Sequence, residues 1–369
     1  MAEQTEFEMA VPEILAGRVD DELRAMIEDL AGAPPAYHPS SFWMHYARLN
    51  IEQLERSGMG NLKRTVGFNY FTWGPGRMAD QLEALRRVSG LRTRWRARRG
   101  ARSWAKALRE GSWATRLDSS RAASYERDYA EFLYLLARVA QERDHLGLLA
   151  RTDEPAFGNP LVIDVDGHRL SEDLCNSAIE VNAMFEPGPV PEAPRICELG
   201  AGYGRVAHLL LNGLPRARVA VIDIPPALYI AQTYLTTVLP DHRAFRYRPF
   251  ERWEDVEREY ERSEIAFFLP HQVELIPSDH FDLVVNISSL HEMTAEQVAL
   301  WFAEIDRIAA GRFYSKQWIE HHNHFDSVTI TRDDYPVPAQ WRALFDRNCP
   351  VQPRFFEALY DVSGGVATR

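Results

Sequence analysis

The chain has 369 residues, of which 46 % are apolar and 26 % are charged, and its formal net charge at pH 7 is −11. This length and apolar content suffice for one large or two smaller domains with a buried core, and they exclude a disordered protein. The negative charge argues against nucleic-acid binding, which requires a basic surface. An acidic start without a leader, and no apolar run near the ~20 residues of a membrane span, predict a cytoplasmic protein with no membrane partner.

The amino-terminal half has the apolar spacing of helices. Apolar residues recur every three or four positions in residues 20–32, 78–90 and 124–151. Residues 185–194, FEPGPVPEAP, contain four prolines and a glycine, which is typical of a linker. We therefore predict a helical domain over residues 1–184 and a second domain over residues 185–369.

One stretch of the helical half is strongly basic. Residues 86–109 interleave arginines with Trp95 and Trp104. This pattern is compatible with a site for an anionic ligand such as a nucleotide diphosphate, or with a solvated basic surface.

Strand and helix patterns alternate after residue 190. Apolar strands are predicted at 195–200, 218–224, 265–270, 281–288 and 312–318, and helices at 204–214, 225–239 and 294–310, the last with Thr294 as its N-cap. Continuous apolar strands spaced by amphipathic helices indicate an α/β fold with a parallel sheet covered on both faces. Its ligand site is expected at the carboxyl ends of the strands.

The cysteines do not suggest a metal or disulfide framework. Cys175, Cys197 and Cys349 are few and scattered, and Cys197 lies in an apolar strand. We expect three buried free thiols and no metal site.

A glycine-rich turn lies at the first of these strand ends, in ELGAGYGRVA (198–207). Dinucleotide-binding turns have the spacing G-x-G-x-x-G, but the position of the third glycine is occupied here by Arg205. A nicotinamide-dependent oxidoreductase is therefore disfavoured.

The turn instead resembles motif I of class I S-adenosylmethionine-dependent methyltransferases. The resemblance implies a Rossmann-like methyltransferase domain that binds S-adenosylmethionine and releases S-adenosylhomocysteine. In such a turn the backbone approaches a cofactor without phosphates, and the carboxylate after the second strand accepts hydrogen bonds from the ribose. The cofactor-binding residues so implied are Glu198, Gly200, Ala201, Gly202, Tyr203, Gly204, Asp223 and Ile224.

Residues 281–305 resemble the strand and histidine-acid loop of small-molecule O-methyltransferases. His291 matches the histidine and Glu292 the acid. The comparison implies that His291 removes the proton of an acceptor hydroxyl and that Glu292 orients the imidazole, which suits a side chain that titrates near neutral pH. A histidine that only caps the following helix is the alternative.

A wider resemblance covers residues 40–320. The stretches SSFWMHYARLN (40–50), GNPLVIDVDGHRLSEDLCNSAIE (158–180), IDIPPALYIAQTYL (222–235) and NISSLHEM (286–293) are similar to bacterial sugar O-methyltransferases of natural-product gene clusters. The resemblance implies methylation of a deoxysugar hydroxyl in antibiotic biosynthesis. It also implies that Asn176 contacts the cofactor and Asp173 the substrate, although an ordinary helix start at Ser171 explains the same residues.

Further polar residues follow the later strands. His271 and Gln272 are candidates for the adenine, Asn286 and Ser288 for the methionine part of the cofactor, and His321 and His322 for the substrate. His324 and Asp326 share that last stretch, and a divalent metal there is the less favoured interpretation, because imidazoles predominate. Four aromatic residues could stack on a sugar or form a helical core: Trp43, Tyr46, Tyr70 and Trp73.

The predicted function is thus O-methylation of a small-molecule acceptor, either a nucleotide-linked sugar or a finished glycoside. A phenolic or polyketide hydroxyl is the alternative acceptor, and a non-catalytic cofactor-binding protein is the alternative class. The helical domain is expected to close over the acceptor and to form a homodimer, because it has more apolar stripes than a lid alone requires.

Overall fold

The computed structural model describes residues 6–15, 20–64, 75–109 and 119–363, and the chain forms two compact units. The first unit contains residues 1–56, 189–348 and 354–369, and the second contains residues 57–188 and 349–353. The boundary between residues 188 and 189 lies inside the proline-rich stretch. Residues 1–56 belong to the same unit as the sheet, whereas the sequence placed them with the helical domain.

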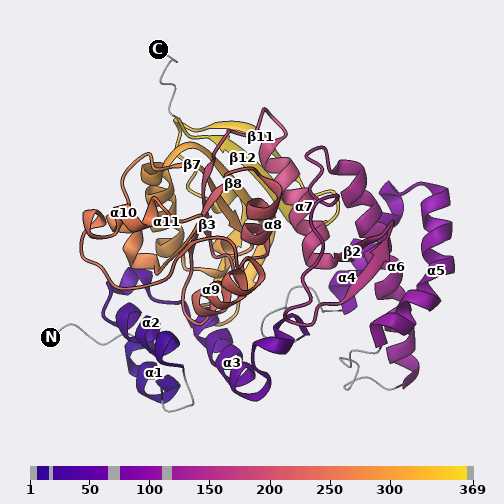
Figure 1. The fold of residues 1–369 in the computed structure, drawn as a ribbon, viewed down its shortest axis with the longest axis horizontal. Helices are drawn as coiled ribbons and strands as arrows, with labels where there is room; N and C mark the ends of the chain where they lie inside the picture. The colour runs from indigo at the N-terminus through magenta and orange to yellow at the C-terminus, as the bar shows by residue number, and fades with distance from the viewer. Residues whose placement is uncertain (1–5, 16–19, 65–74, 110–118, 364–369) are drawn as a thin grey trace. The chain divides into compact units, whose positions relative to one another are not determined.

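The second unit is mainly helical (Figure 1). Its described elements are α4 (Pro75–Val88), α5 (Leu91–Arg109), α6 (Ser119–Arg143), the hairpin β1 (Val162–Val165) and β2 (His168–Ser171), and α7 (Glu172–Phe185), with a 3₁₀ helix at Met59–Arg64. Helix α6 ends eight residues before the predicted end. The Asp144 carboxylate accepts hydrogen bonds from the main chain of Leu148 and Leu149, and Gly147 has a φ of 66°, so the chain turns there.

Helix α5 carries the basic stretch of the sequence. Trp95 is 60 % exposed, and the Arg99 guanidinium lies 5.1 Å from its ring centroid. Arg92, Arg96 and Arg98 are exposed as well. The described part of this stretch therefore presents a basic face to solvent.

An eight-stranded sheet forms the centre of the first unit. Its order is β11-β12-β8-β7-β3-β4-β6-β5. The strands are β3 (Arg195–Leu199), β4 (Arg218–Ile222), β5 (Ala244–Phe245), β6 (Ile265–Phe268), β7 (Phe281–Ile287), β8 (Ala309–Trp318), β11 (Arg342–Asn348) and β12 (Phe355–Asp361). The six strands from β5 to β8 are parallel, and the fold class is α/β. The apolar patterns predicted five of them, whereas the two-residue strand β5 was not predicted.

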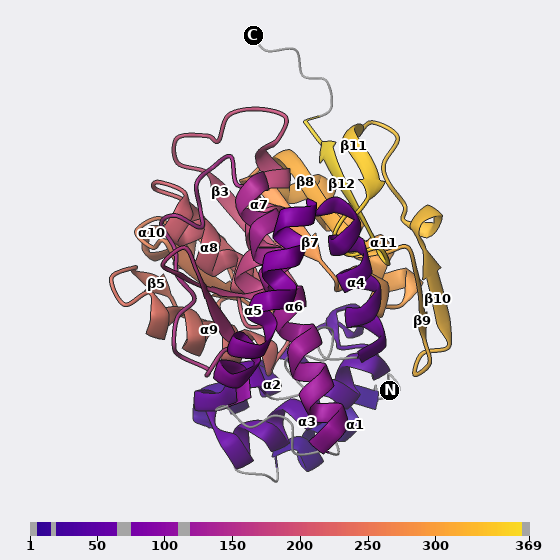
Figure 2. The same ribbon diagram turned by 90° about the vertical axis from the view of Figure 1, so that its right-hand side faces the viewer.

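Helices cover both faces of this sheet. These are α8 (Arg205–Gly213), α9 (Ala227–Val238), the short α10 (Glu257–Tyr260) and α11 (Ala295–Ile308). The crossover from β3 to β4 and the crossover from β7 to β8 run in opposite directions along the sheet. Because such crossovers are right-handed, their helices lie on opposite faces. Figure 2 shows α8 and α9 on one side of the strands and α11 on the other.

The carboxy-terminal end of the sheet was not predicted. β12 pairs antiparallel with β8 and β11 pairs antiparallel with β12, while β9 (Glu320–Asn323) and β10 (Val328–Thr331) form a separate hairpin. The three cysteines are buried and free, as predicted. No helix among the described residues has both the length and the apolar character needed to cross a membrane.

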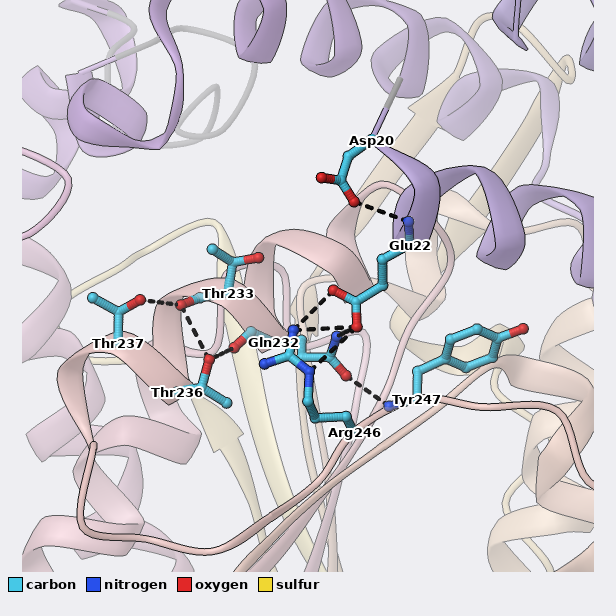
Figure 3. A network of polar contacts seen from close by, with 8 residues as sticks. All are labelled: Asp20, Glu22, Gln232, Thr233, Thr236, Thr237, Arg246 and Tyr247. Carbon is cyan, nitrogen blue, oxygen red and sulfur yellow. Dashed lines mark hydrogen bonds and ion pairs between the residues drawn. The ribbon is translucent and has the colours of Figure 1, made fainter. Parts of the chain in front are cut away.

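The amino-terminal helices of the first unit are α1 (Glu6–Leu15), α2 (Asp21–Ala31) and α3 (Ser41–Ser57). Polar contacts join α2 to α9 and to the segment after β5 (Figure 3). Glu22 accepts a 2.7 Å hydrogen bond from Gln232 and pairs with Arg246, and the Tyr247 hydroxyl donates to Asp29 at 2.7 Å. These contacts explain why residues 20–31 group with the sheet.

Candidate functional site

The carboxyl ends of β3, β4 and β7 meet at one edge of the sheet, where the chain changes direction. From β3 the chain continues to β4 on one side, and it later returns to β7 on the other side. Leu199 pairs with Ile222 of β4 and with Asn286 of β7, so the three strands end level with one another. In open doubly wound sheets, ligands bind at such a switch point.

The glycine turn after β3 adopts a backbone that requires its glycines. Gly200, Gly202 and Gly204 have φ values of 68°, 62° and 86°, a region that other residues rarely enter. A Cβ on Gly200 would overlap the side chain of Ser289, and a Cβ on Gly204 would lie 2.8 Å from Leu235 Cδ1. A Cβ on Gly202 would meet nothing within 4 Å. The turn is therefore tightly packed at both ends and open in the middle.

Asp223 follows β4 directly and is held by main-chain groups of two loops. Gly202 N donates to Oδ2 at 2.8 Å, and Ile224 N donates to Oδ1 at 2.8 Å. Burial raises the pKa of this carboxyl to about 7; the two main-chain donors oppose the rise, and the negative charge of Glu292 adds to it. Each oxygen keeps a second lone pair, so Asp223 can accept further hydrogen bonds from a ligand.

Glu198 links the end of β3 to the first turn of α8 and so stabilises the glycine turn between them. It is 3 % exposed, and its Oε2 accepts a 2.9 Å hydrogen bond from Ala207 N in the first turn of α8. A carboxylate at a helix N-terminus is favourable because it satisfies a main-chain donor and complements the helix dipole. Ala201 and Tyr203 are buried, and the Tyr203 ring lies edge-on to Tyr234 at 5.1 Å. Glu198 and Tyr203 thus help to hold the turn in place.

Asn286, at the carboxyl end of β7, connects three strands through a buried side chain. Its Nδ2 donates to Leu199 O at 3.0 Å and to Ser289 Oγ at 2.6 Å. Its Oδ1 accepts from Leu290 N at 3.3 Å and from Gln317 Nε2 of β8 at 2.6 Å. Asn286 therefore ties the glycine turn to the loop after β7.

Ser288 has two features of a ligand-binding residue. Its φ is 60°, a strained conformation for serine that is often found at functional sites. Its hydroxyl oxygen is buried and has no hydrogen-bond partner among the residues that the structure describes. A buried polar atom is costly without a partner, so this hydroxyl can serve a bound ligand.

His291 and Glu292 are both 0 % exposed. The imidazole Nδ1 lies 3.0 Å from Gln317 Oε1, and Nε2 lies 3.5 Å from Glu292 Oε1. The alternative that His291 caps the following helix is wrong. Helix α11 is capped by Thr294, whose Oγ1 accepts from Gln297 N at 3.3 Å, as the sequence predicted.

Gln317 is the site residue that the sequence analysis missed. It is 0 % exposed and joins Asn286 to His291. A signal was present, because the apolar strand β8 ends in the polar run Ser315, Lys316 and Gln317 at the edge where ligands are expected. All three residues are buried.

The histidine-rich stretch after β8 divides into two parts. The ring of His321 lies 4.8 Å from His291 and 6.0 Å from Phe42, edge-on to each. His322 and His324 are exposed, and His322 Nδ1 lies 2.8 Å from Thr329 Oγ1 across the β9–β10 hairpin. The structure thus brings His321 to the site, and it places His322 on the exposed hairpin.

Asp326 and the aromatic residues of α3 lie beside His321. The Asp326 carboxylate accepts hydrogen bonds from Ser41 N at 3.0 Å and Phe42 N at 3.2 Å, so it caps α3. Phe42 also contacts Trp43 and Tyr46, with ring centroids 5.6 Å and 4.8 Å away. Tyr70 and Trp73 lie outside the described residues, and so does the side chain of Trp104.

The two adenine candidates after β6 differ in their surroundings. Gln272 uses its amide within the protein, because Oε1 accepts from Leu269 N at 2.9 Å and Nε2 donates to Arg248 O at 3.0 Å. His271 Nε2 lies 3.6 Å from Asp29 Oδ2, while Nδ1 is buried and has no partner in the described part of the chain. Burial lowers the pKa of His271, against the charge of Asp29. Of the two candidates, His271 therefore has a ring nitrogen that can form a hydrogen bond with a ligand.

Asn176 and Asp173 lie on α7 of the second unit. Ser171 caps this helix by accepting a 3.0 Å hydrogen bond from Leu174 N, which confirms the helix start read from the sequence. Asn176 Oδ1 is buried, and no described residue forms a hydrogen bond with it. Among the described residues, no three His, Cys, Asp or Glu side chains are grouped so that they could hold a metal ion.

No protein-family model matches the chain, and no curated protein matches its sequence. Solved structures of methyltransferases match about half of it. A TehB-like SAM-dependent methyltransferase from Corynebacterium glutamicum is 16 % identical, over 50 % of this chain and 85 % of its own, with a TM-score of 0.33. The 1,6-didemethyltoxoflavin-N1-methyltransferase of Burkholderia thailandensis is 15 % identical, and the match covers 52 % of this chain and 78 % of the methyltransferase, with a TM-score of 0.34. A geranyl diphosphate methyltransferase is 10 % identical, and the match covers 51 % of this chain and 76 % of that enzyme, with a TM-score of 0.37.

Proposed function

We propose that this chain is an S-adenosylmethionine-dependent methyltransferase. The observation that carries the proposal is Asp223, which lies at the end of β4 and is held at 2.8 Å by Gly202 N and Ile224 N beside a left-handed glycine turn. A carboxylate at this place in an α/β sheet can accept hydrogen bonds from the hydroxyls of a ribose. The ELGAGYG sequence supports the same cofactor.

The charge at this edge of the sheet favours a cationic cofactor over a nucleotide phosphate. Glu292 lies close enough for its charge to raise the pKa of Asp223. When Asp223 is ionised, above its pKa of about 7, the two carboxylates oppose the binding of a phosphate and attract a sulfonium. When bound, S-adenosylmethionine supplies a methyl group that a nucleophile can accept. The residues that would hold it are the main chain of Gly200–Gly204, Asp223, Ile224 and the Ser288 hydroxyl, with His271 as the adenine contact.

The proposed acceptor is a hydroxyl group, and His291 is the proposed base. A hydroxyl becomes a good nucleophile when its proton is removed, and Nε2 of His291 can accept that proton. The carboxylate of Glu292, 3.5 Å away, then stabilises the imidazolium. In this conformation the imidazole is buried, so the acceptor must displace neighbouring side chains to reach it.

The proposed substrate is a deoxysugar, as the family resemblance of residues 40–320 implies. The ring of His321 next to His291, and the ring of Phe42 next to His321, support a ring-shaped acceptor. The same aromatic rings favour a phenolic or polyketide hydroxyl as the second candidate. We also propose that the helical part of the chain covers the acceptor. A further proposal is that it forms a homodimer, and sedimentation analysis tests the oligomeric state.

A non-catalytic cofactor-binding protein is the candidate from another class. The observation that favours it is the burial of His291, whose two ring nitrogens both face protein side chains. His291→Ala separates the two candidates, because in an enzyme it keeps cofactor binding and loses about 10²- to 10⁴-fold in turnover.

The test is mass spectrometry after incubation with trideuteromethyl S-adenosylmethionine. The acceptor sets are nucleotide-linked deoxysugars, finished glycosides and phenols, and His291→Ala is included with each set. A label on either sugar set supports the proposal, and a label on phenols alone replaces the sugar by the second candidate. If the protein binds the cofactor but labels no set, the non-catalytic candidate is favoured. A thermal shift with NAD but none with S-adenosylmethionine contradicts the proposal.

A further inference from the structure

The loop after β7 and the end of β8 contain a chain of buried amides that ends at His291. We infer that Gln317 keeps a proton on Nδ1 of His291, so that Nε2 is the nitrogen that gains and loses a proton beside Glu292. This makes Gln317 a positioning residue. Its consequence for catalysis rests on the proposed function, whereas the protonation pattern itself does not.

The orientation of the Asn286 amide is fixed first. Its Nδ2 lies 3.0 Å from Leu199 O, a carbonyl that can only accept. Its Oδ1 lies 3.3 Å from Leu290 N, a main-chain group that can only donate. Exchanging the two ends of this amide would break both contacts, so Oδ1 faces Gln317.

The orientation of the Gln317 amide follows from that of Asn286. Gln317 Nε2 lies 2.6 Å from Asn286 Oδ1 and 3.2 Å from Asn286 O, and Ser315 Oγ lies 3.3 Å away. If the amide were reversed, its oxygen would face two oxygens that cannot donate. The amide nitrogen must therefore point at Asn286, and Oε1 must point at His291.

The protonation of His291 is set by this oxygen. Gln317 Oε1 can only accept, and it lies 3.0 Å from Nδ1, so Nδ1 must carry a hydrogen. This holds for the neutral ring and for the imidazolium alike. The second nitrogen, Nε2, faces Glu292 Oε1 at 3.5 Å, and it is the position at which the charge of the ring changes.

Two residues, and not one, contact the two nitrogens of the His291 ring. The sequence predicts that Glu292 orients the imidazole. Gln317 instead holds Nδ1, and Glu292 provides a negative charge next to Nε2. A base oriented in this way presents its lone pair at Nε2 whenever it is neutral, because Nδ1 stays protonated.

The direct test is ¹⁵N NMR of histidine-labelled wild-type protein, which contains 12 histidines. Comparison with His291→Gln identifies the signals of His291. We expect a protonated Nδ1 from about pH 5 to 9, with any titration confined to Nε2. A neutral ring with its proton on Nε2 and an unprotonated Nδ1 would overturn the inference. The protonation is read from the spectrum of the wild-type chain, and His291→Gln is used only to assign the signals of His291.

A matched pair of variants tests the consequence. Gln317→Leu removes the acceptor, whereas Ser315→Ala removes a neighbour of Nε2 and leaves Oε1 in place. We expect Gln317→Leu to populate the Nε2-protonated ring and to lower kcat about 10²-fold, with an unchanged KM for S-adenosylmethionine. Ser315→Ala should change neither. Retention of the Nδ1 proton and of kcat in Gln317→Leu would overturn the inference. If the wild type labels no acceptor, the proposed function fails while the NMR result still decides the protonation.

Discussion

Two buried glutamines of the first unit use their amides in the same way but lie in different surroundings. Gln232 on α9 accepts from Tyr247 N at 2.6 Å and donates to Glu22 at 2.7 Å (Figure 3). Glu22 also pairs with Arg246, and these two side chains are 30 % and 50 % exposed. Water can therefore replace a partner that Glu22 or Arg246 loses, although Gln232 itself is buried.

Gln317 forms hydrogen bonds with buried groups. Its partners Asn286 and His291 are each 0 % exposed, and so is Glu292, which lies next to His291. A lost partner there leaves a polar group without water. The two glutamines therefore differ in the exposure of their partners. Gln232 joins a partly exposed ion pair, whereas Gln317 joins side chains that are fully buried.

The largest effect is expected from Asn286→Leu, because this substitution removes the centre of the buried network. Each buried polar partner left unsatisfied costs about 1–3 kcal/mol, so the free energy of unfolding should fall by roughly 3–5 kcal/mol. Gln232→Leu is the control. It leaves Arg246 paired with Glu22 and should cost about 1–2 kcal/mol. Urea denaturation measures both, and equal losses would contradict the distinction between the two networks.

Gly200→Ala tests how closely the buried network supports the cofactor turn. The new Cβ would overlap Ser289, whose hydroxyl is held by Asn286, and a φ of 68° is strained for alanine. We expect cofactor affinity to fall about 100-fold, with Gly147→Ala as the control, because Gly147 has a φ of 66° and open space around it but lies in the second unit, outside the turn. Calorimetric titration with S-adenosylhomocysteine measures this. The contact with Ser289 is unimportant if the two variants bind equally well.

The smallest effect is expected from Arg246→Gln in the exposed network. The ion pair with Glu22 is largely solvated, so its loss should cost less than about 1 kcal/mol and should cost even less at high salt. Thermal unfolding at two salt concentrations measures this. A loss as large as that of Asn286→Leu would show that exposure does not separate the networks.

The sequence predicted the parts of this molecule whose signals are local. Short patterns determine the apolar strands β3, β4, β6, β7 and β8, the helix cap at Thr294, and the glycine turn followed by Asp223. Their place at one edge follows from the rules for parallel sheets.

Residues that act through distant partners were not predictable in this way. Gln317 contacts His291 from 26 positions away, and Asp326 caps α3 from 285 positions away. The position of strand β12 is set by its pairing with β8, and residues 1–56 belong to the unit that contains the sheet. Such pairings are tertiary and leave no periodic signal.

We propose that the edge formed by β3, β4 and β7 binds S-adenosylmethionine through Asp223. Isothermal titration of S-adenosylhomocysteine from about pH 5.5 to 8.5 measures this binding. The free carboxyl has a pKa of about 7, and a ligand that donates hydrogen bonds to the carboxylate lowers this pKa. Affinity should therefore rise up to about tenfold per pH unit below pH 7 and level off above it, and Asp223→Asn should bind weakly without this pH dependence. No binding by the wild type, or binding that Asp223→Asn leaves unchanged, would contradict the account.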